Sequence, residues 1–342
     1  MSLDFDSLQD IAQAMTIKGK GILAADESNP TCKKRFDSIG VDSTEQNRNI
    51  YRDMLFTTKG MEKFISGVIL FDETIRQSTI KERVSFPDFL SGLGVIPGIK
   101  VDAGAKHLSG TNDEKVTEGL DGLDDRLKEY YSLGARFAKW RAVITIGDSE
   151  PSGTCISANA HALARYASLC QKNGIVPIVE PEILMDGAHP IEDSFFVSEE
   201  VLHTVFYELY GQNVELEGMV LKPNMVLSGY NCSDQASVEQ VAELTVTVFK
   251  RSVPSAVPGI AFLSGGQSDE HATAHLNAMN QLIGDNSPWN LTFSYGRALQ
   301  APALKAWAGK DENISDAQEA FYKRAKLNSL ATKGDYSAGM ES

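Results

Sequence analysis

Residues 218–229 read Gly-Met-Val-Leu-Lys-Pro-Asn-Met-Val-Leu-Ser-Gly. Their apolar beginning, bounded by a glycine and followed by a proline, is typical of a short, fully buried strand. Pro223 has no backbone N–H with which to continue a strand ladder, so the strand should end at Lys222. Because burial disfavours an ammonium ion, the pKa of such a lysine should fall, and its free amine can then attack a carbonyl. For Lys222 alone, a side chain that extends to solvent is the simpler interpretation. Whether Lys222 is instead a buried nucleophile depends on which residues lie at the other strand ends.

Short apolar runs of the same kind recur along the chain, and segments with helical periodicity separate them. The predicted strands are residues 22–25, 67–71, 95–101, 135–144, 175–179, 218–221, 259–263 and 291–294. The predicted helices are residues 6–21, 44–65, 123–133, 157–173, 198–210, 237–253, 268–283 and 315–330. Two of these helices begin with a capping-box pattern, formed by Ser43 with Gln46 and by Ser315 with Gln318.

Eight strands that alternate with helices predict an α/β fold, a single (β/α)8 TIM barrel over residues 1–342 with extra N- and C-terminal helices. No linker rich in Pro, Ser or Gly divides the chain, and the GxGxxG fingerprint of an open doubly wound sheet is absent. We expect residues 335–342 to form a short flexible C-terminal tail.

The composition is that of an ordinary soluble globular protein. The chain has 342 residues, of which 42% are hydrophobic, and a net charge of −14. This charge argues against nucleic acid or an anionic membrane as the main partner, although a locally basic pocket can still bind an anion. The N-terminal MSLDFDSLQD is acidic, unlike a secretory signal or a basic transit peptide, and no apolar run is long enough to span a bilayer. The four cysteines are widely spaced and form no CxxC, which argues against a metal cluster or a redox pair. Four thiols in a chain of this length predict a reducing compartment, either the cytoplasm or the interior of a plastid-like organelle after processing.

Polar residues gather at the predicted carboxyl ends of the strands, which meet on one face of a barrel. They are Asp26, Lys100, Lys139, Arg141, Glu180, Glu182, Lys222, Ser264 and Arg297. Residues of these types are seldom buried, so a matched set of cations and carboxylates at so many strand ends predicts a site.

Two pairs within this set alternate along a strand and therefore share a face. Lys139 and Arg141, if they point inward, place two cations near Lys222 and lower its pKa further. The alternative is a structural ion-pair network with Glu180 and Glu182. One of these carboxyl groups can serve as a general acid while the other stays ionised, and for Glu182 a structural role is favoured.

The last two strands predict a phosphate site. Ser264, Gly265 and Gly266 offer a hydroxyl and unobstructed N–H groups at a helix start, where the helix dipole favours an anion. Gly296 and Arg297 follow the last strand and add a guanidinium group. The loops after strands seven and eight are the usual phosphate position in this architecture.

Two histidines and two tryptophans have simpler interpretations. His271 and His275 are four residues apart on a predicted helix, but no acidic residue accompanies them as in a catalytic zinc helix. They are predicted to be a helix-surface pair. Trp140 and Trp307 are predicted to be packing residues.

Seven motifs, in order and with compatible spacing, resemble class I fructose-1,6-bisphosphate aldolase. They are LAADES (23–28), GIKVD (98–102), FAKWR (137–141), VEPEIL (179–184), LKPNM (221–225), FLSGGQS (262–268) and FSYGRALQ (293–300). The resemblance implies a metal-independent enzyme without a cofactor, because the iminium ion itself is the electron sink. It implies reversible cleavage of fructose 1,6-bisphosphate to dihydroxyacetone phosphate and glyceraldehyde 3-phosphate, in glycolysis, gluconeogenesis or the Calvin cycle. It also implies a homotetramer.

The resemblance further implies a role for each site residue. Lys222 would form the Schiff base, Glu180 would expel water from the carbinolamine, Lys139 would position and stabilise it, and Asp26 would accept the C4-hydroxyl proton. The resemblance implies that the C1 phosphate binds Ser264, Gly265, Ser294 and Arg297, with Arg35 nearby, and that the other phosphate binds Ser28, Thr31 and Lys100. From their places at the strand ends, we also expect Gly266, Gly296, Arg141 and Glu182 to take part in substrate binding.

The chain departs from the family pattern in three places. It ends in Gly-Met-Glu-Ser, where the family commonly has a longer tail closing with a tyrosine that assists proton exchange on the enamine. Ala103 stands where many members have a lysine, which we expect to weaken binding of the second phosphate. Thr31 replaces a serine but keeps the hydroxyl group.

Two other functions are compatible with the residues. One is a zinc-dependent aldolase that uses His271 and His275, which a chelator would inactivate. The other is a non-catalytic barrel that binds sugar phosphates or a protein partner, which leaves the joint presence of Lys222, Glu180 and Asp26 unexplained.

Overall fold

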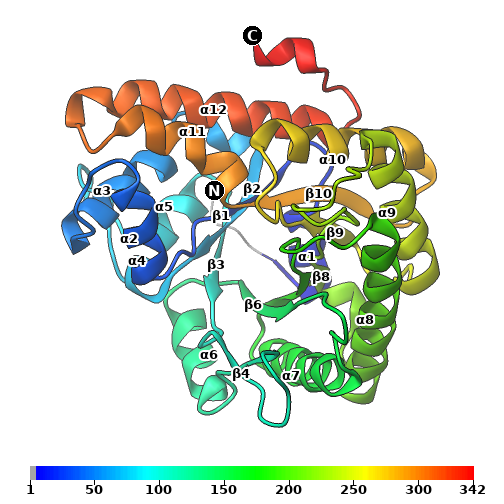
Figure 1. Cartoon of the computed structure of the whole chain (residues 1–342). Helices are drawn as coiled ribbons and strands as arrows, with labels where there is room; N and C mark the ends of the chain where they lie inside the picture. Colours follow the sequence, from blue (N-terminus) through cyan, green and yellow to red (C-terminus); the bar gives the residue numbers. More distant parts are fainter. Residues whose placement is uncertain (1–4) are drawn as a thin grey trace.

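Eight parallel strands close into a barrel in this computed structural model, which describes residues 5–342. The order around the barrel is β1-β10-β9-β8-β7-β6-β3-β2, and every neighbouring pair is parallel (Figure 1). The strands are β1 Gly21–Ala24, β2 Ile65–Leu70, β3 Ile96–Lys100, β6 Phe137–Ile144, β7 Val176–Ile183, β8 Val220–Leu221, β9 Gly259–Phe262 and β10 Asn290–Tyr295. The predicted fold class is confirmed, and each predicted strand overlaps one strand of the barrel, although several bounds differ. Residues 1–4, part of the N-terminal stretch compared above with signal peptides, lie outside the described residues.

Helices surround the barrel. They are α1 Leu8–Met15, α2 Asn29–Asp37, α3 Glu45–Phe56, α4 Asp72–Ile75, α5 Phe86–Gly92, α6 Leu123–Ser132, α7 Gly153–Lys172, α8 Ile191–Gly211, α9 Val238–Ser252, α10 Asp269–Ile283, α11 Arg297–Trp307 and α12 Ile314–Ala331. A small antiparallel pair, β4 Ala105–His107 and β5 Lys115–Thr117, follows β3. The sequence pattern did not predict this pair or the helices α2, α4, α5 and α11. In residues 5–342, no helix combines the length and apolarity that crossing a membrane requires.

Both predicted capping boxes are wrong. Helix α3 is capped by Thr44, whose hydroxyl accepts the Asn47 N–H, rather than by Ser43. Helix α12 begins at Ile314, so Ser315 lies inside it and cannot cap it, and the Gln318 amide donates to the Met54 carbonyl at 3.0 Å. The box that does form joins Ser237 and Gln240 at the start of α9.

The predicted helix over 44–65 is too long. It stops at Phe56, and the chain turns through Gly60 at a φ of +89° before β2 begins. A left-handed residue cannot continue a right-handed helix, and glycine adopts this conformation without strain.

Helix α1 covers the amino-terminal end of the barrel (Figure 1). Its buried residues Ile11, Ala12 and Met15 join the apolar cluster inside the barrel, and Ser66 at the start of β2 donates to the Met15 carbonyl at 2.6 Å. Phe137 fills the interior so completely that a Cβ atom on Gly98 would lie 2.2 Å from its ring. This closed and filled end leaves the carboxyl ends of the strands as the face that can hold a ligand.

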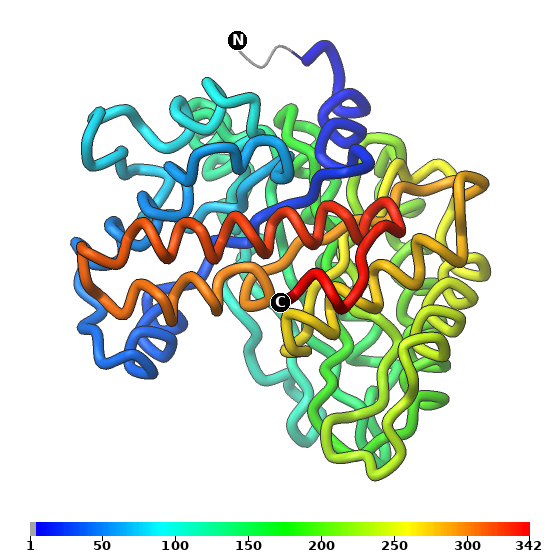
Figure 2. The backbone as a smooth tube through the Cα atoms, turned by 90° about the horizontal axis from the view of Figure 1, so that it is seen from above, coloured from blue at the N-terminus to red at the C-terminus, as the bar shows by residue number. Residues whose placement is uncertain are grey.

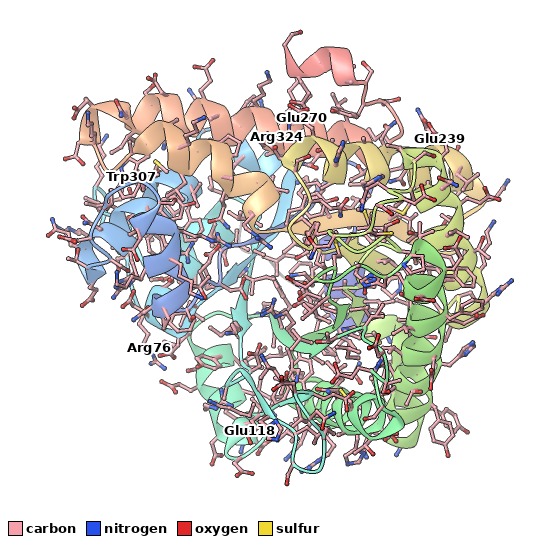
Figure 3. The ribbon with its side chains drawn as sticks, in the orientation of Figure 1. Arg76, Glu118, Glu239, Glu270, Trp307 and Arg324 are labelled. Atoms are coloured by element: carbon pink, nitrogen blue, oxygen red, sulfur yellow. The ribbon has the colours of Figure 1, made fainter. Side chains whose placement is uncertain are left out.

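The C-terminal helices α11 and α12 run side by side along one flank (Figure 2). Trp307 lies at the end of α11 (Figure 3) and is 1% exposed. It packs against Phe36 and Tyr51, with ring centroids 5.6 Å away in both cases. Trp140 is also fully buried, so both tryptophans are packing residues, as predicted.

The chain after α12 contacts the body of the protein. The buried Arg324 donates to the Glu341 carboxylate at 2.6 Å, and the Tyr336 N–H donates to the Asn277 side chain at 2.9 Å. Flexibility of residues 335–342, like the single-domain organisation, stays a prediction.

Candidate active site

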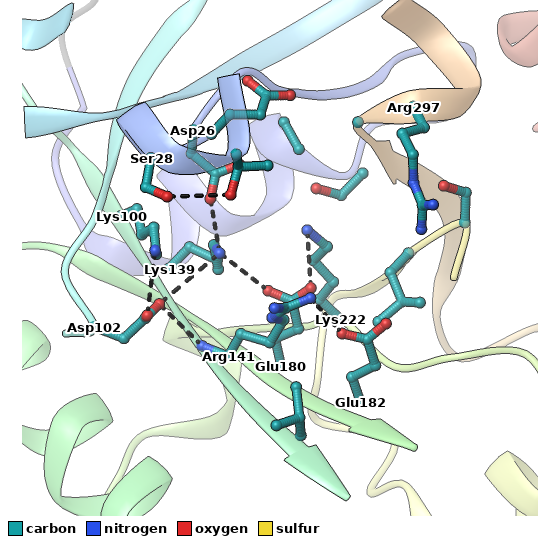
Figure 4. A pocket seen from close by; sticks show the side chains of 18 of the residues that line it. Asp26, Ser28, Lys100, Asp102, Lys139, Arg141, Glu180, Glu182, Lys222 and Arg297 are labelled. Carbon is teal, nitrogen blue, oxygen red and sulfur yellow. Dashed lines mark hydrogen bonds and ion pairs between the residues drawn. The ribbon is translucent and has the colours of Figure 1, made fainter. Parts of the chain in front are cut away.

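A cavity of about 210 Å³ opens at the carboxyl ends of the strands. Figure 4 shows the charged side chains that converge there from β3, β6 and β7 and from the segments after β1, β8 and β10. Its lining includes every candidate site residue except Gly266: Asp26, Ser28, Thr31, Arg35, Lys100, Lys139, Arg141, Glu180, Glu182, Lys222, Ser264, Gly265, Ser294, Gly296 and Arg297. Their location is thus observed, whereas their individual roles stay predictions.

Lys222 points into the cavity from the end of β8. The backbone N–H of Lys222 donates to the Val179 carbonyl of β7 at 2.8 Å, and the backbone N–H of Leu263, just after β9, donates to the Pro223 carbonyl at 3.1 Å. Hydrogen bonds from both sides therefore fix the position of this strand end. The ammonium Nζ lies 3.2 Å from Glu180 Oε1, and both side chains are 4% exposed. The interpretation of Lys222 as a lysine that extends to solvent is therefore wrong.

Lys139 is the central cation of the site. Its Nζ lies 2.7 Å from Asp26 Oδ2, 3.6 Å from Glu180 Oε2 and 3.9 Å from Asp102 Oδ2. Burial alone would lower the pKa of Lys139, but Asp26, Glu180 and Asp102 together raise it above its ordinary value. Lys139 is consequently a fixed positive charge at neutral pH.

Asp26 is correspondingly held as a carboxylate. Burial would raise its pKa, yet the nearby cations Lys139, Lys222 and Lys100 bring the pKa of Asp26 well below its ordinary value. A carboxylate that stays ionised at neutral pH is available to accept a proton.

Glu180 and Glu182 belong to β7 itself rather than to a loop after it. The predicted strand ended at residue 179, whereas β7 continues to Ile183 despite Pro181. Arg141 donates to Glu182 at 2.9 Å, but burial still raises the pKa of Glu182 above its ordinary value. The ion pairs expected for a structural network are therefore present, and they line the cavity.

The loop after β9 leads into α10 with two glycines in left-handed conformations, Gly265 at φ +59° and Gly266 at φ +90°. Gly266 does not line the cavity, but a Cβ atom there would lie 2.9 Å from Nη2 of Arg297, so its lack of a side chain makes room for that arginine. The buried hydroxyl of Ser294 finds no hydrogen-bond partner within residues 5–342. Backbone N–H groups, a free hydroxyl and a guanidinium suit an anion.

Asp102 was not among the predicted site residues. Its side chain is 4% exposed, its Oδ1 lies 3.4 Å from the Lys100 ammonium, and its Oδ2 faces Lys139. Its position two residues after Lys100, just beyond a strand end, was the available signal.

The predicted helix-surface histidine pair is wrong for His275. This residue is 6% exposed, its Nδ1 lies 2.6 Å from Gln267 Oε1, and burial lowers its pKa to about 4. Within residues 5–342, no group of three or more His, Cys, Asp and Glu side chains is arranged to hold a metal ion.

The sequence matches one family model and is similar to proteins of the same family from bacteria and plants. A family model described as fructose-bisphosphate aldolase class-I matches residues 7–342. A protein of Xanthomonas axonopodis pv. citri named "Probable fructose-bisphosphate aldolase class 1" is 57% identical over 336 residues, which cover 98% of this chain and 99% of the relative. "Fructose-bisphosphate aldolase 4, cytosolic" of Arabidopsis thaliana is also 57% identical, over 93% of this chain and 80% of its own length.

A solved structure agrees over nearly the whole chain. The fructose-bisphosphate aldolase of Plasmodium falciparum, in a complex with TRAP and a small-molecule inhibitor, superimposes with a TM-score of 0.95 at 51% identity, covering 99% of this chain and 98% of that one. With the closed barrel and its buried lysine site, these matches show that the chain belongs to the class-I fructose-bisphosphate aldolase family and is a lyase that cleaves fructose 1,6-bisphosphate.

Proposed function

We propose that this aldolase works through a Schiff base on Lys222, with Glu180, Lys139 and Asp26 moving and holding the protons. The observation that carries the proposal is the 3.2 Å distance between Lys222 Nζ and Glu180 Oε1 inside a buried pocket. A nucleophile within hydrogen-bond reach of a group that can take its proton is the arrangement that covalent catalysis needs.

The first step joins the enzyme to the ketose. The free amine of Lys222 attacks the C2 carbonyl to give a carbinolamine, and Glu180 then protonates the C2 hydroxyl, which leaves as water and gives the iminium ion. Oε2 of Glu180 has no hydrogen-bond partner within residues 5–342, so this oxygen can serve the leaving hydroxyl. Lys139, 3.6 Å away, stabilises the carboxylate that forms when the proton has left.

The second step breaks the C3–C4 bond. Asp26 accepts the C4-hydroxyl proton, the C3–C4 electron pair moves into the iminium to form an enamine, and glyceraldehyde 3-phosphate leaves. The lowered pKa of Asp26, which Lys139, Lys222 and Lys100 maintain against burial, keeps its carboxylate ionised before this transfer. Protonation of the enamine at C3 and hydrolysis then release dihydroxyacetone phosphate.

The two phosphates occupy opposite ends of the cavity. The C1 phosphate binds Ser264, Gly265, Ser294 and Arg297, with Gly266 and Gly296 leaving room and Arg35 nearby. The other phosphate binds Ser28, Thr31 and Lys100. The hydroxyl groups of Ser28 and Thr31 form a hydrogen bond with each other, with 3.1 Å between their oxygens. Arg141 and Glu182 form the polar wall between the ends. This locally basic lining explains how a chain with a net charge of −14 binds a bisphosphate.

We also infer that the enzyme is a cytoplasmic homotetramer. Three aromatic side chains on α8 are exposed, Phe196 at 64%, Tyr207 at 75% and Tyr210 at 83%, and exposed aromatic faces favour association with another protein surface. Its cysteines are free thiols, which suits a reducing compartment, and one relative is named as cytosolic.

Sedimentation velocity should give a tetramer, and a monomer at micromolar concentration would contradict the assembly.

Replacing Glu180 by glutamine should slow Schiff-base formation and lower kcat by about 10²- to 10⁴-fold, because the amide cannot donate the proton that expels water. Borohydride trapping after timed mixing with dihydroxyacetone phosphate measures that rate. Glu182→Gln is the matched control on the same strand face and should have a smaller effect. Wild-type trapping rates in Glu180→Gln would remove Glu180 from its role.

Replacing Asp26 by asparagine should separate the two steps. Cleavage of fructose 1,6-bisphosphate should fall by about 10²- to 10⁴-fold, whereas trapping with dihydroxyacetone phosphate should persist, because iminium formation does not use the C4-hydroxyl proton. Asp102→Asn also removes a carboxylate that faces Lys139 and controls for the general loss of charge. If Asp26→Asn loses trapping as completely as cleavage, its assignment as the C4 base is wrong.

A further inference from the structure

One carboxylate and two guanidinium groups meet at the wall of the active-site cavity: Glu27 and Arg35 line it, and Arg52 lies behind them. Glu27, the residue after Asp26, accepts a hydrogen bond from Arg35 Nη1 and another from the Gln300 amide at 2.9 Å, both at Oε1. Its Oε2 lies 2.5 Å from Arg52 Nη2. Glu27 therefore joins an arginine from α2 to an arginine from α3.

The two arginines differ in their access to the cavity. The Arg52 side chain is 2% exposed and does not line the cavity, so it cannot touch the substrate. It is held in place by Cys32 Sγ at 3.6 Å and Gln300 Oε1 at 3.5 Å. The Arg35 side chain is 21% exposed and lines the cavity beside the candidate phosphate end.

Arg35 has donors left over after its contact with Glu27. A guanidinium group carries five N–H donors, and Nη1 makes the bond to Glu27. Nη2 lies on the side of Gly296, since a Cβ atom added there would be 3.7 Å from it. Gly296 precedes Arg297, so Arg35 and Arg297 approach the same end of the cavity from different elements.

The charges of the group leave one positive charge to spare. Burial would raise the pKa of Glu27, but Arg35 and Arg52 lower it, and Glu27 in turn keeps Arg52 protonated against burial by raising its pKa. The positive charge of Arg52 compensates the negative charge of Glu27, so the positive charge of Arg35 is left to act on an anion. Without Arg52, Glu27 would neutralise Arg35 itself.

We propose that Glu27 and Arg52 are positioning residues for substrate phosphate: Glu27 directs Arg35 toward the Gly296–Arg297 end of the cavity, and Arg52 neutralises Glu27 so that Arg35 keeps its charge for the phosphate. The inference rests on the proposed role of Arg35 at the C1 phosphate. The alternative is a purely structural ion pair that ties α2 and α3 to the end of β1. Such a pair would affect folding but would not adjust phosphate affinity according to charge.

The test compares the charge states of this group in the full-length enzyme. Arg52→Gln leaves Glu27 and Arg35 to cancel each other, so KM for fructose 1,6-bisphosphate should rise about tenfold, the effect of one lost charge-assisted contact, with a much smaller change in kcat. The double variant Glu27→Gln with Arg52→Gln restores the spare charge on Arg35, and its KM should return to within about threefold of wild type. Titration of active sites by borohydride trapping corrects for misfolded enzyme.

Two further variants keep the outcomes distinct. Arg35→Ala should raise KM by at least as much as Arg52→Gln; an unchanged KM in Arg35→Ala would refute the proposed function of Arg35 itself. A raised KM in Arg35→Ala with an unchanged KM in Arg52→Gln, or a double variant without recovery, would overturn only the positioning role. Removing one partner of a buried pair can prevent folding. Arg52→Lys keeps the charge and should bind with nearly wild-type KM, so a KM as high as that of Arg35→Ala would also overturn the inference.

Discussion

The ammonium group of Lys139 lies between the carboxylates of Asp26 and Glu180, at 2.7 and 3.6 Å, in a pocket with little access to water. Each of these charges would be costly to bury by itself, because the interior solvates an ion poorly. Together they are stable only if β6, β7 and the segment after β1 stay within a few ångströms of one another. The chemistry of the site therefore depends on the closure of the barrel.

The barrel meets this requirement by rigid packing away from the site. Helix α1 fills one end, and the ring of Phe137 occupies the space that Gly98 leaves, so the strands cannot slide without a clash. On the active-site side, the chain makes hydrogen bonds across the strand ends, such as the Ile183 N–H to the Asn224 side chain at 3.0 Å. This bond ties the end of β7, which carries Glu180 and Glu182, to the segment that carries Lys222. Glu180 and Lys222, the proposed acid and nucleophile, are thus held 3.2 Å apart before substrate arrives.

Local signals predicted the strands and the charged residues at their carboxyl ends, whereas Ser28, Thr31, Arg35 and Ser294 were expected only from the family resemblance. A buried strand of a parallel barrel is a short apolar run, and its carboxyl end is marked by the first polar residues after it. The missed features depend on contacts between distant residues. Gln318 was predicted to cap its own helix, but it bonds to Met54 across a helix–helix contact. Arg52 sits on a helix whose buried face only the packed structure defines, so its pairing with Glu27 could not be read from spacing. His275 is polar in sequence yet buried beside Gln267 for the same reason.

Borohydride reduction of the enzyme with dihydroxyacetone phosphate, followed by mass mapping of the peptides, tests the central claim most directly. The proposed mechanism predicts one reduced adduct, on Lys222, and none in Lys222→Met. An adduct on Lys139 or Lys100 would support covalent catalysis but would contradict the assignment of Lys222 as the nucleophile. An active enzyme that traps no adduct and loses activity in a chelator would contradict the Schiff-base mechanism.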